Sequence, residues 1–168
     1  MIERIRSNEL NIVNDLSIEE KLISYLIENK MTISAAESCT GGMIMSTLIN
    51  VPGASKVINE GYVTYSEEAK MRILGVVKST IDKYSVYSKE VALQMALGVR
   101  KLSKADVAVS VTGVTDNNEG TFDYCIIINS HPYLYHYTVF GSRNEIRNKQ
   151  TRIILWTVLE LLQGKNDI

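Results

Sequence analysis

The chain has 168 residues, of which 45% are hydrophobic and 22% are charged, and its formal net charge is −1. These values are typical of one globular domain with its own core, and they exclude a disordered chain. Basic and acidic residues are nearly balanced and no basic block occurs, so the sequence argues against nucleic-acid binding and favours a small-molecule ligand.

Neither secretion nor membrane insertion is indicated by the sequence. No apolar run resembles a signal-peptide core or approaches ~18 residues, so we expect a cytoplasmic protein that contacts no membrane. Cys39 and Cys125 are too few and too far apart for a disulfide framework or a metal-binding pair. We therefore expect two reduced thiols, no metal and no cofactor.

The predicted domain begins near residue 17. Residues 1–16 are weakly periodic and are expected to form an N-terminal arm, and residues 17–168 to form a single domain. Ser17 and Glu20 fit a capping box, in which the serine begins the helix and the glutamate bonds back to it. A helix is predicted from there to about Lys30.

Strands and helices alternate through the rest of the chain. Apolar β-branched runs predict strands, and serine-capped periodic runs predict helices. The last two strands predict a hairpin around residues 130–132. We expect a three-layer α/β/α sandwich around a mixed, mostly parallel sheet of five to six strands. The expected strands cover residues 32–36, 60–65, 107–111, 124–129 and 133–139, and the expected helices cover 43–49, 66–74, 144–162 and a segment that starts at Ser88.

The segment 35–42, AAESCTGG, joins a predicted strand to a predicted helix and contains two candidate nucleophiles, Ser38 and Cys39. N–H groups in the first turn of a helix lack internal partners and can stabilise an oxyanion. The glycine pair would let a substrate approach the backbone closely. The same pattern also fits an ordinary helix start, with Ser38 or Thr40 as the N-cap.

A nucleophilic serine needs a base to take its proton. The only two histidines, His131 and His136, fall in the predicted hairpin and do not indicate a Ser-His-Asp triad. A neutral lysine can serve instead when burial or a neighbouring cation lowers its pKa. Lys70 is the candidate, because it lies on the first turns of the helix after TYSEE, beside a strand end that should approach Ser38.

Several short motifs, separated along the chain, occur in a characteristic order. They are AAESCTGG, then VPGAS at 51–55, GYVTYSEEAK at 61–70, SKEVA at 88–92, ADVAVSVTG at 105–113 and GSR at 141–143. From Leu22 to Leu162 the chain thereby resembles the C-terminal domain of the CinA competence/damage-inducible family. Enzymatic members of that family include the nicotinamide mononucleotide deamidases of the PncC type.

The resemblance implies hydrolysis of the carboxamide of nicotinamide mononucleotide to nicotinate mononucleotide and ammonia. It assigns the role of nucleophile to Ser38 and of general base to Lys70. Tyr65 would orient the lysine or polarise the substrate. In the implied mechanism Ser38 attacks the amide carbon, the N–H groups after it hold the oxyanion, Lys70 returns the proton to ammonia, and water cleaves the acyl-enzyme.

Residues around the predicted dyad are expected to contact the substrate, because carboxyl ends of strands meet at one edge of such sheets. Glu37 is expected either to bond the backbone or Lys70, or only to favour a helix N-terminus. Cys39 is expected to be a small buried packing side chain. Arginines can bind a phosphate bidentately. The expected substrate-binding residues are Glu37, Cys39, Thr40, Gly41, Gly42, Thr112, Gly113, Arg143 and Arg147.

The segment that follows the TG motif departs from the family pattern. Enzymatic relatives have a loop of the type Ala-Gly-Pro-x-Gly, whereas residues 114–119 here contain no proline and two acids. A carboxylate near a phosphate-bearing substrate weakens the binding free energy by ~1 kcal/mol per charge. Two hypotheses follow: an amidohydrolase, or a non-catalytic or repurposed relative that binds a nucleotide or a protein partner.

Tyr133, Tyr135 and Tyr137 alternate along the last predicted strand. They predict an aromatic face for core or subunit packing rather than a stacking platform. His136, on the opposite face, is expected to be structural. Together with the N-terminal arm, this strand predicts a homo-oligomer, a dimer or larger.

Overall fold

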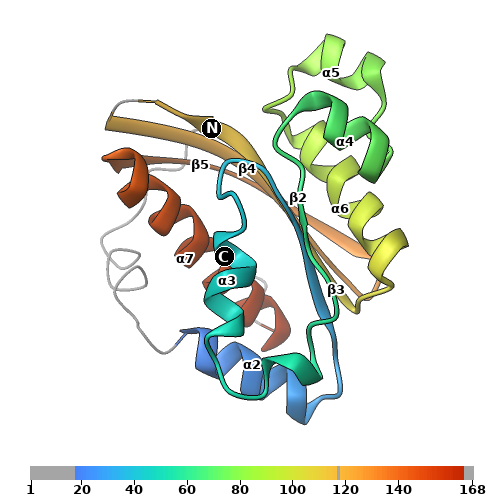
Figure 1. Ribbon diagram of the computed structural model, residues 1–168, viewed down its shortest axis with the longest axis vertical. Coiled ribbons are helices and arrows are strands. Elements are labelled where there is room, and N and C mark those ends of the chain that lie inside the picture. The colour runs from blue at the N-terminus through green and yellow to red at the C-terminus, as the bar shows by residue number, and fades with distance from the viewer. Residues whose placement is uncertain (1–17, 117, 165–168) are drawn as a thin grey trace.

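The computed structural model describes residues 18–116 and 118–164 and has one mixed sheet between two layers of helices (Figure 1). The strand order is β2-β1-β3-β4-β5. Strand β1 is parallel to β2 and β3, and β4 is antiparallel to β3 and β5. The predicted three-layer α/β/α architecture is confirmed. The strands are β1 (Ile33–Glu37), β2 (Tyr62–Val63), β3 (Val107–Thr115), β4 (Asn118–Ile128) and β5 (His131–Gly141).

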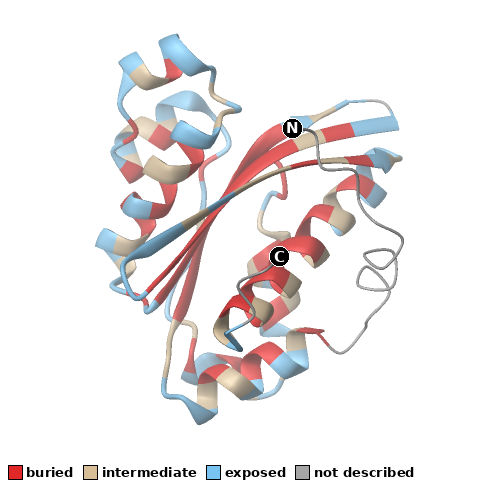
Figure 2. Ribbon diagram, turned by 180° about the vertical axis from the view of Figure 1, so that it is seen from behind, coloured by how far each residue is buried: buried red, intermediate tan, exposed pale blue. Residues whose placement is uncertain are grey.

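Each face of the sheet is covered by its own group of helices. Helices α2, α3 and α7 pack on one face, and α4, α5 and α6 pack on the other. Figure 2 shows buried residues along the sheet and on the helix faces turned toward it. The bounds are α2 (Ile18–Glu28), α3 (Met43–Ile49), the 3-10 helix η1 (Ala54–Lys56), α4 (Glu67–Leu74), α5 (Lys78–Tyr84), α6 (Lys89–Ser103) and α7 (Arg143–Leu162).

Strand β3 illustrates how the sequence produces two cores. Val107, Val109 and Val111 pack with the layer of α2, α3 and α7, whereas Ala108 packs with the layer of α4 to α6. Successive strand side chains point to opposite faces, so a continuous apolar run buries both. Ser110 is the polar exception, and its hydroxyl donates to a backbone carbonyl of α6 at 2.6 Å.

Local sequence signals set the ends of the helices near the site. The Ser66 hydroxyl accepts the N–H of Ala69 at 3.0 Å, and Ser88 caps α6 in the same way. Gly75 ends α4 with a φ of 73°, a left-handed conformation that glycine adopts without strain. These predicted helix boundaries are confirmed.

The loop expected over residues 114–119 was a wrong prediction at both of its ends, because residues 114 and 115 belong to β3 and residues 118 and 119 belong to β4. Strand β3 runs on to Thr115 and β4 begins at Asn118, so Thr112 and Gly113 lie inside a strand and not at its end. A Cβ on Gly113 would lie 2.5 Å from the carbonyl oxygen of Thr121. Glycine is therefore needed here for the close approach of β4.

Three smaller expectations also need correction. The strand expected over 60–65 is reduced to the two residues of β2. The turn between β4 and β5 consists of Asn129 and Ser130, both with positive φ, so residues 131 and 132 belong to β5. Helix α5 was not predicted. The expected arm over residues 1–16 and the cap at Ser17 lie outside the described residues.

The aromatic face of β5 packs in the core, as predicted. The Tyr137 ring stacks on those of Phe122 and Tyr124, with centroids 6.0 and 5.9 Å apart. On the opposite face, Nδ1 of His136 lies 2.9 Å from a carboxylate oxygen of buried Asp123. Within the described residues, no helix has the length and apolar character needed to cross a membrane.

Replacing Gly98 with alanine is expected to destabilise the fold by about 2 kcal/mol or more. A Cβ at this position would overlap the carbonyl oxygen of Leu74, where α4 packs against α6, and backbone cannot easily give way. Gly61→Ala is a matched control, since the three atoms nearest to its Cβ all belong to the flexible Met45 side chain. Urea unfolding of both variants checks this. Equal stabilities would contradict it.

Candidate active site

Ser38 lies directly beyond the carboxyl end of β1. Its N–H donates to the carbonyl of Val111 at 3.1 Å, which extends the pairing of β1 with β3 by one residue. Alternation along the strand places its side chain on the same face as Ala36, toward the layer of α4 to α6. The side chain is 4% exposed. Ser38 is thereby aimed at the helix that carries the predicted base.

Lys70 reaches Ser38 from the second turn of α4. Its Nζ lies 2.9 Å from Ser38 Oγ, 2.9 Å from the carbonyl oxygen of Thr64 and 3.2 Å from that of Tyr65. Lys70 is 1% exposed, although lysine is almost never fully buried. The hydrogen-bonding distance expected of a nucleophile and its base is therefore met.

Burial lowers the pKa of the Lys70 ammonium, because a charged group is poorly solvated inside the protein. The structure describes no carboxylate in an ion pair with this ammonium. Its hydrogen-bond partners are one hydroxyl and two backbone carbonyls, all neutral. The lowered pKa makes the neutral amine, the form that can accept a proton from Ser38, easier to reach than in a solvated lysine.

Cys39 belongs to the core and is not a competing nucleophile. Its side chain packs with the layer of α2, α3 and α7. Burial raises the pKa of its thiol to about 12, and the N–H groups of Cys39 and Thr40 offset only part of that rise. The thiolate is the reactive form of cysteine, so this thiol is inert near neutral pH. The prediction that Cys39 is a buried packing residue is confirmed.

Glu37 holds the loop between β1 and α3. One carboxylate oxygen accepts the Thr40 hydroxyl at 2.7 Å and the N–H groups of Gly42 and Ile44, and the other accepts the N–H of Met45 at 2.9 Å. The carboxylate thus takes up the N–H groups at the start of α3. These groups are therefore not free to hold an oxyanion, a role that the sequence had left possible for the first turn of this helix.

The alternative interpretation, in which Ser38 or Thr40 of AAESCTGG is only the N-cap of a helix, is wrong. Helix α3 begins at Met43, and its N-cap is Gly42, which has a φ of 94° and no side-chain cap. Neither Ser38 nor Thr40 caps the helix. The Glu37 carboxylate, at the end of β1, accepts the N–H groups at the start of the helix instead. The Ser38 hydroxyl therefore remains hydrogen-bonded to Lys70.

Two arginines of α7 reach the same loop region. Arg147 Nη2 donates to the Thr40 carbonyl at 2.7 Å. Arg143 donates to the Thr115 carbonyl at 2.6 Å and to the Tyr65 hydroxyl at 3.2 Å. The structure therefore brings both predicted arginines beside the Ser38 loop. Tyr65 is 63% exposed, so its ring lies at the surface above the lysine.

Other predicted substrate-binding residues are buried and already bonded. The Thr112 hydroxyl donates to the Val86 carbonyl at 2.9 Å, and the Thr40 hydroxyl donates to Glu37. Gly113 is packed against β4. Gly41, in contrast, is exposed and has a φ of 62°. Of the glycine pair and the TG motif, Gly41 is the residue best placed to meet a substrate.

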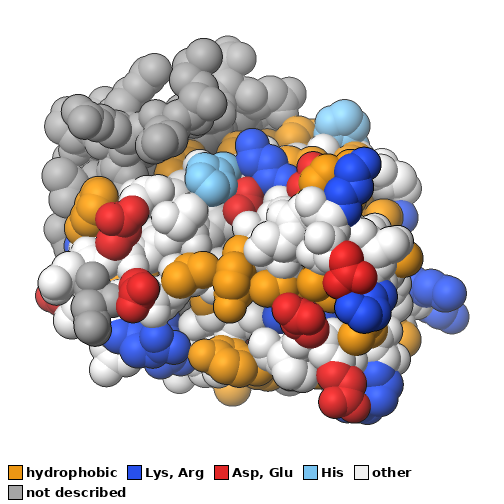
Figure 3. All heavy atoms as spheres, turned by 90° about the horizontal axis from the view of Figure 1, so that it is seen from above, with side chains coloured by type: hydrophobic (Ala, Val, Ile, Leu, Met, Phe, Trp, Pro, Cys, Tyr) orange, Lys and Arg blue, Asp and Glu red, His pale blue; other side chains and the backbone are white. Residues whose placement is uncertain are grey.

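Two hollows flank this end of the sheet. One of about 230 Å³ lies beside Gly42 and Val63, and one of about 510 Å³ is lined by Val114, Asp116, Glu119 and Thr121 at the hairpin. Figure 3, which views the molecule from above the carboxyl ends of β1 and β3, shows acidic, basic and hydrophobic side chains interspersed on this face. No cluster suited to a metal ion occurs among residues 18–116 and 118–164.

The carbonyls that hold Lys70 were missed by sequence reasoning. Thr64 and Tyr65 accept from Nζ through backbone oxygens, which any residue type carries, so composition gives no signal for them. Their position could have been inferred only from the turn between β2 and α4. The N–H of Thr64 donates to the Glu37 carbonyl at 2.8 Å and fixes this turn beside Ser38.

Solved structures of other proteins share the overall fold of this chain. Solved structures similar to the chain include a competence or damage-inducible protein from Enterobacter asburiae, with a TM-score of 0.84 and 26% identity over 88% of this chain and 97% of that one. A CinA superfamily protein from Escherichia coli has a TM-score of 0.83 and 28% identity over 96% of this chain and 95% of that one.

Curated relatives are longer than this chain. A CinA-like protein of Petrotoga mobilis is 38% identical over 89% of the chain and 39% of its own length. A putative competence-damage inducible protein of Alkaliphilus oremlandii is 43% identical over 92% of the chain and 40% of its own length. The chain thus spans about two fifths of these relatives. The family model of the CinA C-terminal domain matches residues 15–162, and the chain belongs to that family.

Proposed function

We propose that this chain is an amidohydrolase that converts nicotinamide mononucleotide, or a closely related nucleotide amide, to the acid and ammonia. The observation that carries the proposal is the 2.9 Å approach of Lys70 Nζ to Ser38 Oγ inside the protein. A buried serine–lysine pair with a lowered lysine pKa is a known way to activate a hydroxyl. The family resemblance supplies the substrate.

The two carbonyls beside Lys70 explain how the base is aimed. A neutral amine has two N–H groups and one lone pair. The carbonyls of Thr64 and Tyr65 accept the two N–H groups, and the lone pair then faces Ser38 Oγ. When the amine takes the serine proton, all three N–H groups have acceptors. The same geometry therefore serves both protonation states.

The chemical steps follow from this pair. Ser38 Oγ attacks the carboxamide carbon while its proton passes to Lys70 Nζ. The C–N bond then breaks, and Lys70 returns the proton to the departing ammonia. Water then adds to the resulting ester while Lys70 accepts its proton, and Lys70 returns that proton to Ser38 Oγ as the ester C–O bond breaks and the acid is released. The net change is one amide and one water converted to one acid and ammonia.

Donors for the oxyanion must come from the loop rather than from the α3 N-terminus. The N–H groups of Cys39 and Thr40 follow Ser38 directly and are not among the donors to Glu37. We assign them to the oxyanion. Arg143 and Arg147 are assigned to the substrate phosphate, since both reach this loop region and arginine binds phosphate bidentately.

The experiment that tests the function is an ammonia-release assay with nicotinamide mononucleotide at neutral pH. The wild-type protein is expected to release ammonia and nicotinate mononucleotide in equal amounts, and Ser38→Ala is expected to release neither. A wild-type protein that binds the nucleotide without releasing ammonia would instead support a repurposed binding module. The two acidic residues within 114–119 are the reason for considering that alternative.

The pH dependence of the reaction is expected to follow Lys70. Because the neutral amine is the base and burial lowers its pKa below the ordinary 10.5, activity should rise with pH through that lowered value. The logarithm of kcat/KM against pH measures it. An acid limb that appears only near the pKa of a solvated lysine would contradict the assignment.

A further inference from the structure

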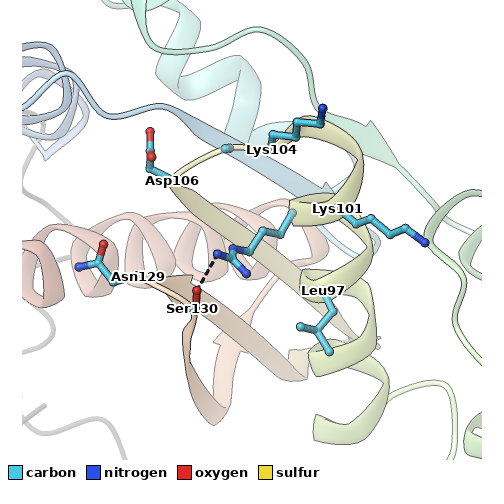
Figure 4. Close-up of a pocket in the computed structure, with 8 residues that line it drawn as sticks. Leu97, Lys101, Lys104, Asp106, Asn129 and Ser130 are labelled. Carbon is cyan, nitrogen blue, oxygen red and sulfur yellow. Dashed lines mark hydrogen bonds between the residues drawn. The ribbon is translucent and has the colours of Figure 1, made fainter.

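A hollow of about 680 Å³ lies at the opposite end of the sheet from Ser38. It is formed by the C-terminal half of α6, the connection into β3 and the turn between β4 and β5. Figure 4 shows Leu97, Lys101 and Lys104 projecting from α6 and its C-terminal end, with Ser130 on the facing turn. We call it the basic hollow, lined by Leu97, Arg100, Lys101, Lys104, Asp106 and Ser130 among others.

The charges that line the basic hollow are not balanced. Arg100, Lys101 and Lys104 contribute three positive charges against the single carboxylate of Asp106. That carboxylate already accepts the N–H and the hydroxyl of Thr32 at 2.8 and 2.9 Å. In the part of the chain that the structure describes, none of the three basic side chains is paired with a carboxylate.

Arg100 is held in place by a neutral partner. Its Nη2 donates to the Ser130 hydroxyl at 2.8 Å, across the hollow from α6. Ser130 has a φ of 67° in the two-residue turn between β4 and β5, which places this residue opposite the C-terminal half of α6. A hydroxyl leaves the guanidinium charge uncompensated and its remaining N–H donors available. This hydrogen bond directs the guanidinium toward the turn that faces α6.

We propose that the basic hollow binds a small phosphorylated molecule. Its volume falls within the ~300–1,000 Å³ of small-molecule sites. An oriented arginine matches phosphate oxygens bidentately, and the two flexible lysines at the rim can close over the remaining charge. Leu97 is 49% exposed and offers an apolar wall for the rest of the ligand. The proposal does not depend on the amidase function, because Ser38 lies at the other end of β1 and β3.

Isothermal titration with ADP at low ionic strength tests the proposal on the full chain. The wild-type protein is expected to bind ADP saturably, and Arg100→Gln/Lys104→Gln is expected to weaken binding about tenfold or more. Ser130→Ala, which keeps every charge, is expected to weaken it by a smaller factor. Lys78→Gln/Lys83→Gln removes the same charge from the surface of α5 and should leave the affinity unchanged.

A second double variant, Arg143→Gln/Arg147→Gln, separates this site from the catalytic end. It is expected to keep the ADP affinity of the basic hollow, and circular dichroism checks that each variant is folded. Any one of three results would overturn the proposal. The first is that the wild type shows no saturable binding of ADP, and the second is that neither Arg100→Gln/Lys104→Gln nor Ser130→Ala changes the affinity. The third is that Arg143→Gln/Arg147→Gln abolishes binding while the variants in the basic hollow do not.

Discussion

Replacing Lys70 with methionine is expected to lower deamidation by about 10²- to 10⁴-fold, the range that general bases contribute. Methionine has a similar length but no amine to accept a proton, so Ser38 loses the proposed base that lies 2.9 Å away. The measurement is the rate of ammonia release at saturating substrate. Lys56→Met, at an exposed lysine of η1, is the matched control and should keep the wild-type rate.

Lys70→Met has two opposing effects on stability, because it removes a buried amine and also leaves the carbonyls of Thr64 and Tyr65 without the Nζ donor. The sign of the pH effect follows from linkage. The folded pKa of Lys70 is lowered, so between that value and 10.5 the unfolded chain binds more protons than the folded one. Wild-type stability should rise with pH through this window. Lys70→Met should remove that rise, and a persistent rise would contradict the assignment.

Glu37→Ala is expected to destabilise the protein by roughly 3–5 kcal/mol, because it leaves several buried donors without an acceptor. The wild-type carboxylate accepts the Thr40 hydroxyl and three backbone N–H groups at the start of α3. Urea unfolding monitored by circular dichroism measures the loss. Glu37→Gln keeps one carbonyl acceptor and should lose less.

Glu28 provides the control for that experiment, since it lies exposed at the end of α2. Glu28→Gln is expected to change stability by less than ~0.5 kcal/mol. If Glu37→Ala unfolds at the same urea concentration as the wild type, then the carboxylate does not organise the loop, and the conclusion that Glu37 occupies the α3 N-terminus is wrong.

The layers could be predicted because they rest on short-range patterns, whereas the pairing of Ser38 with Lys70 was expected mainly from the resemblance to the CinA family. The valines of β3 and the serine caps of α4 and α6 are legible in the sequence. Ser38 follows β1, and the segment before α4 pairs with β1, so parallel strands bring Lys70 to Ser38. Adjacent strand ends converge whatever the exact loop conformation.

The remaining features depend on contacts between distant segments. Gly113 was interpreted as a strand end, yet it is glycine because β4 approaches it closely. Helix α5 has seven residues and only Ile81 buried, so it has too little periodicity to be recognised. In the basic hollow, Arg100 is hydrogen-bonded to Ser130, which lies 30 residues further along the chain. No local sequence pattern predicts that these two residues are in contact.

The use of the N–H groups at the start of α3 was not determined by the sequence, for a similar reason. They were considered as possible oxyanion donors, but the side chain of Glu37 folds back onto them from the preceding strand. Sequence reasoning left open whether this glutamate bonds the backbone, contacts Lys70 or only favours the helix end. The structure shows that it bonds the backbone. Which partner Glu37 bonds depends on the direction of its side chain, and the local sequence does not determine that direction.

The central claim is that Ser38 forms an acyl-enzyme with the help of Lys70, and intact-protein mass spectrometry after rapid acid quenching tests it most directly. During turnover of nicotinamide mononucleotide, the wild type is expected to carry a nicotinyl ester that peptide mapping places on Ser38. Ser38→Ala should carry no ester and release no ammonia. Undiminished ammonia release by Ser38→Ala, or an ester mapped to another residue, would contradict the account.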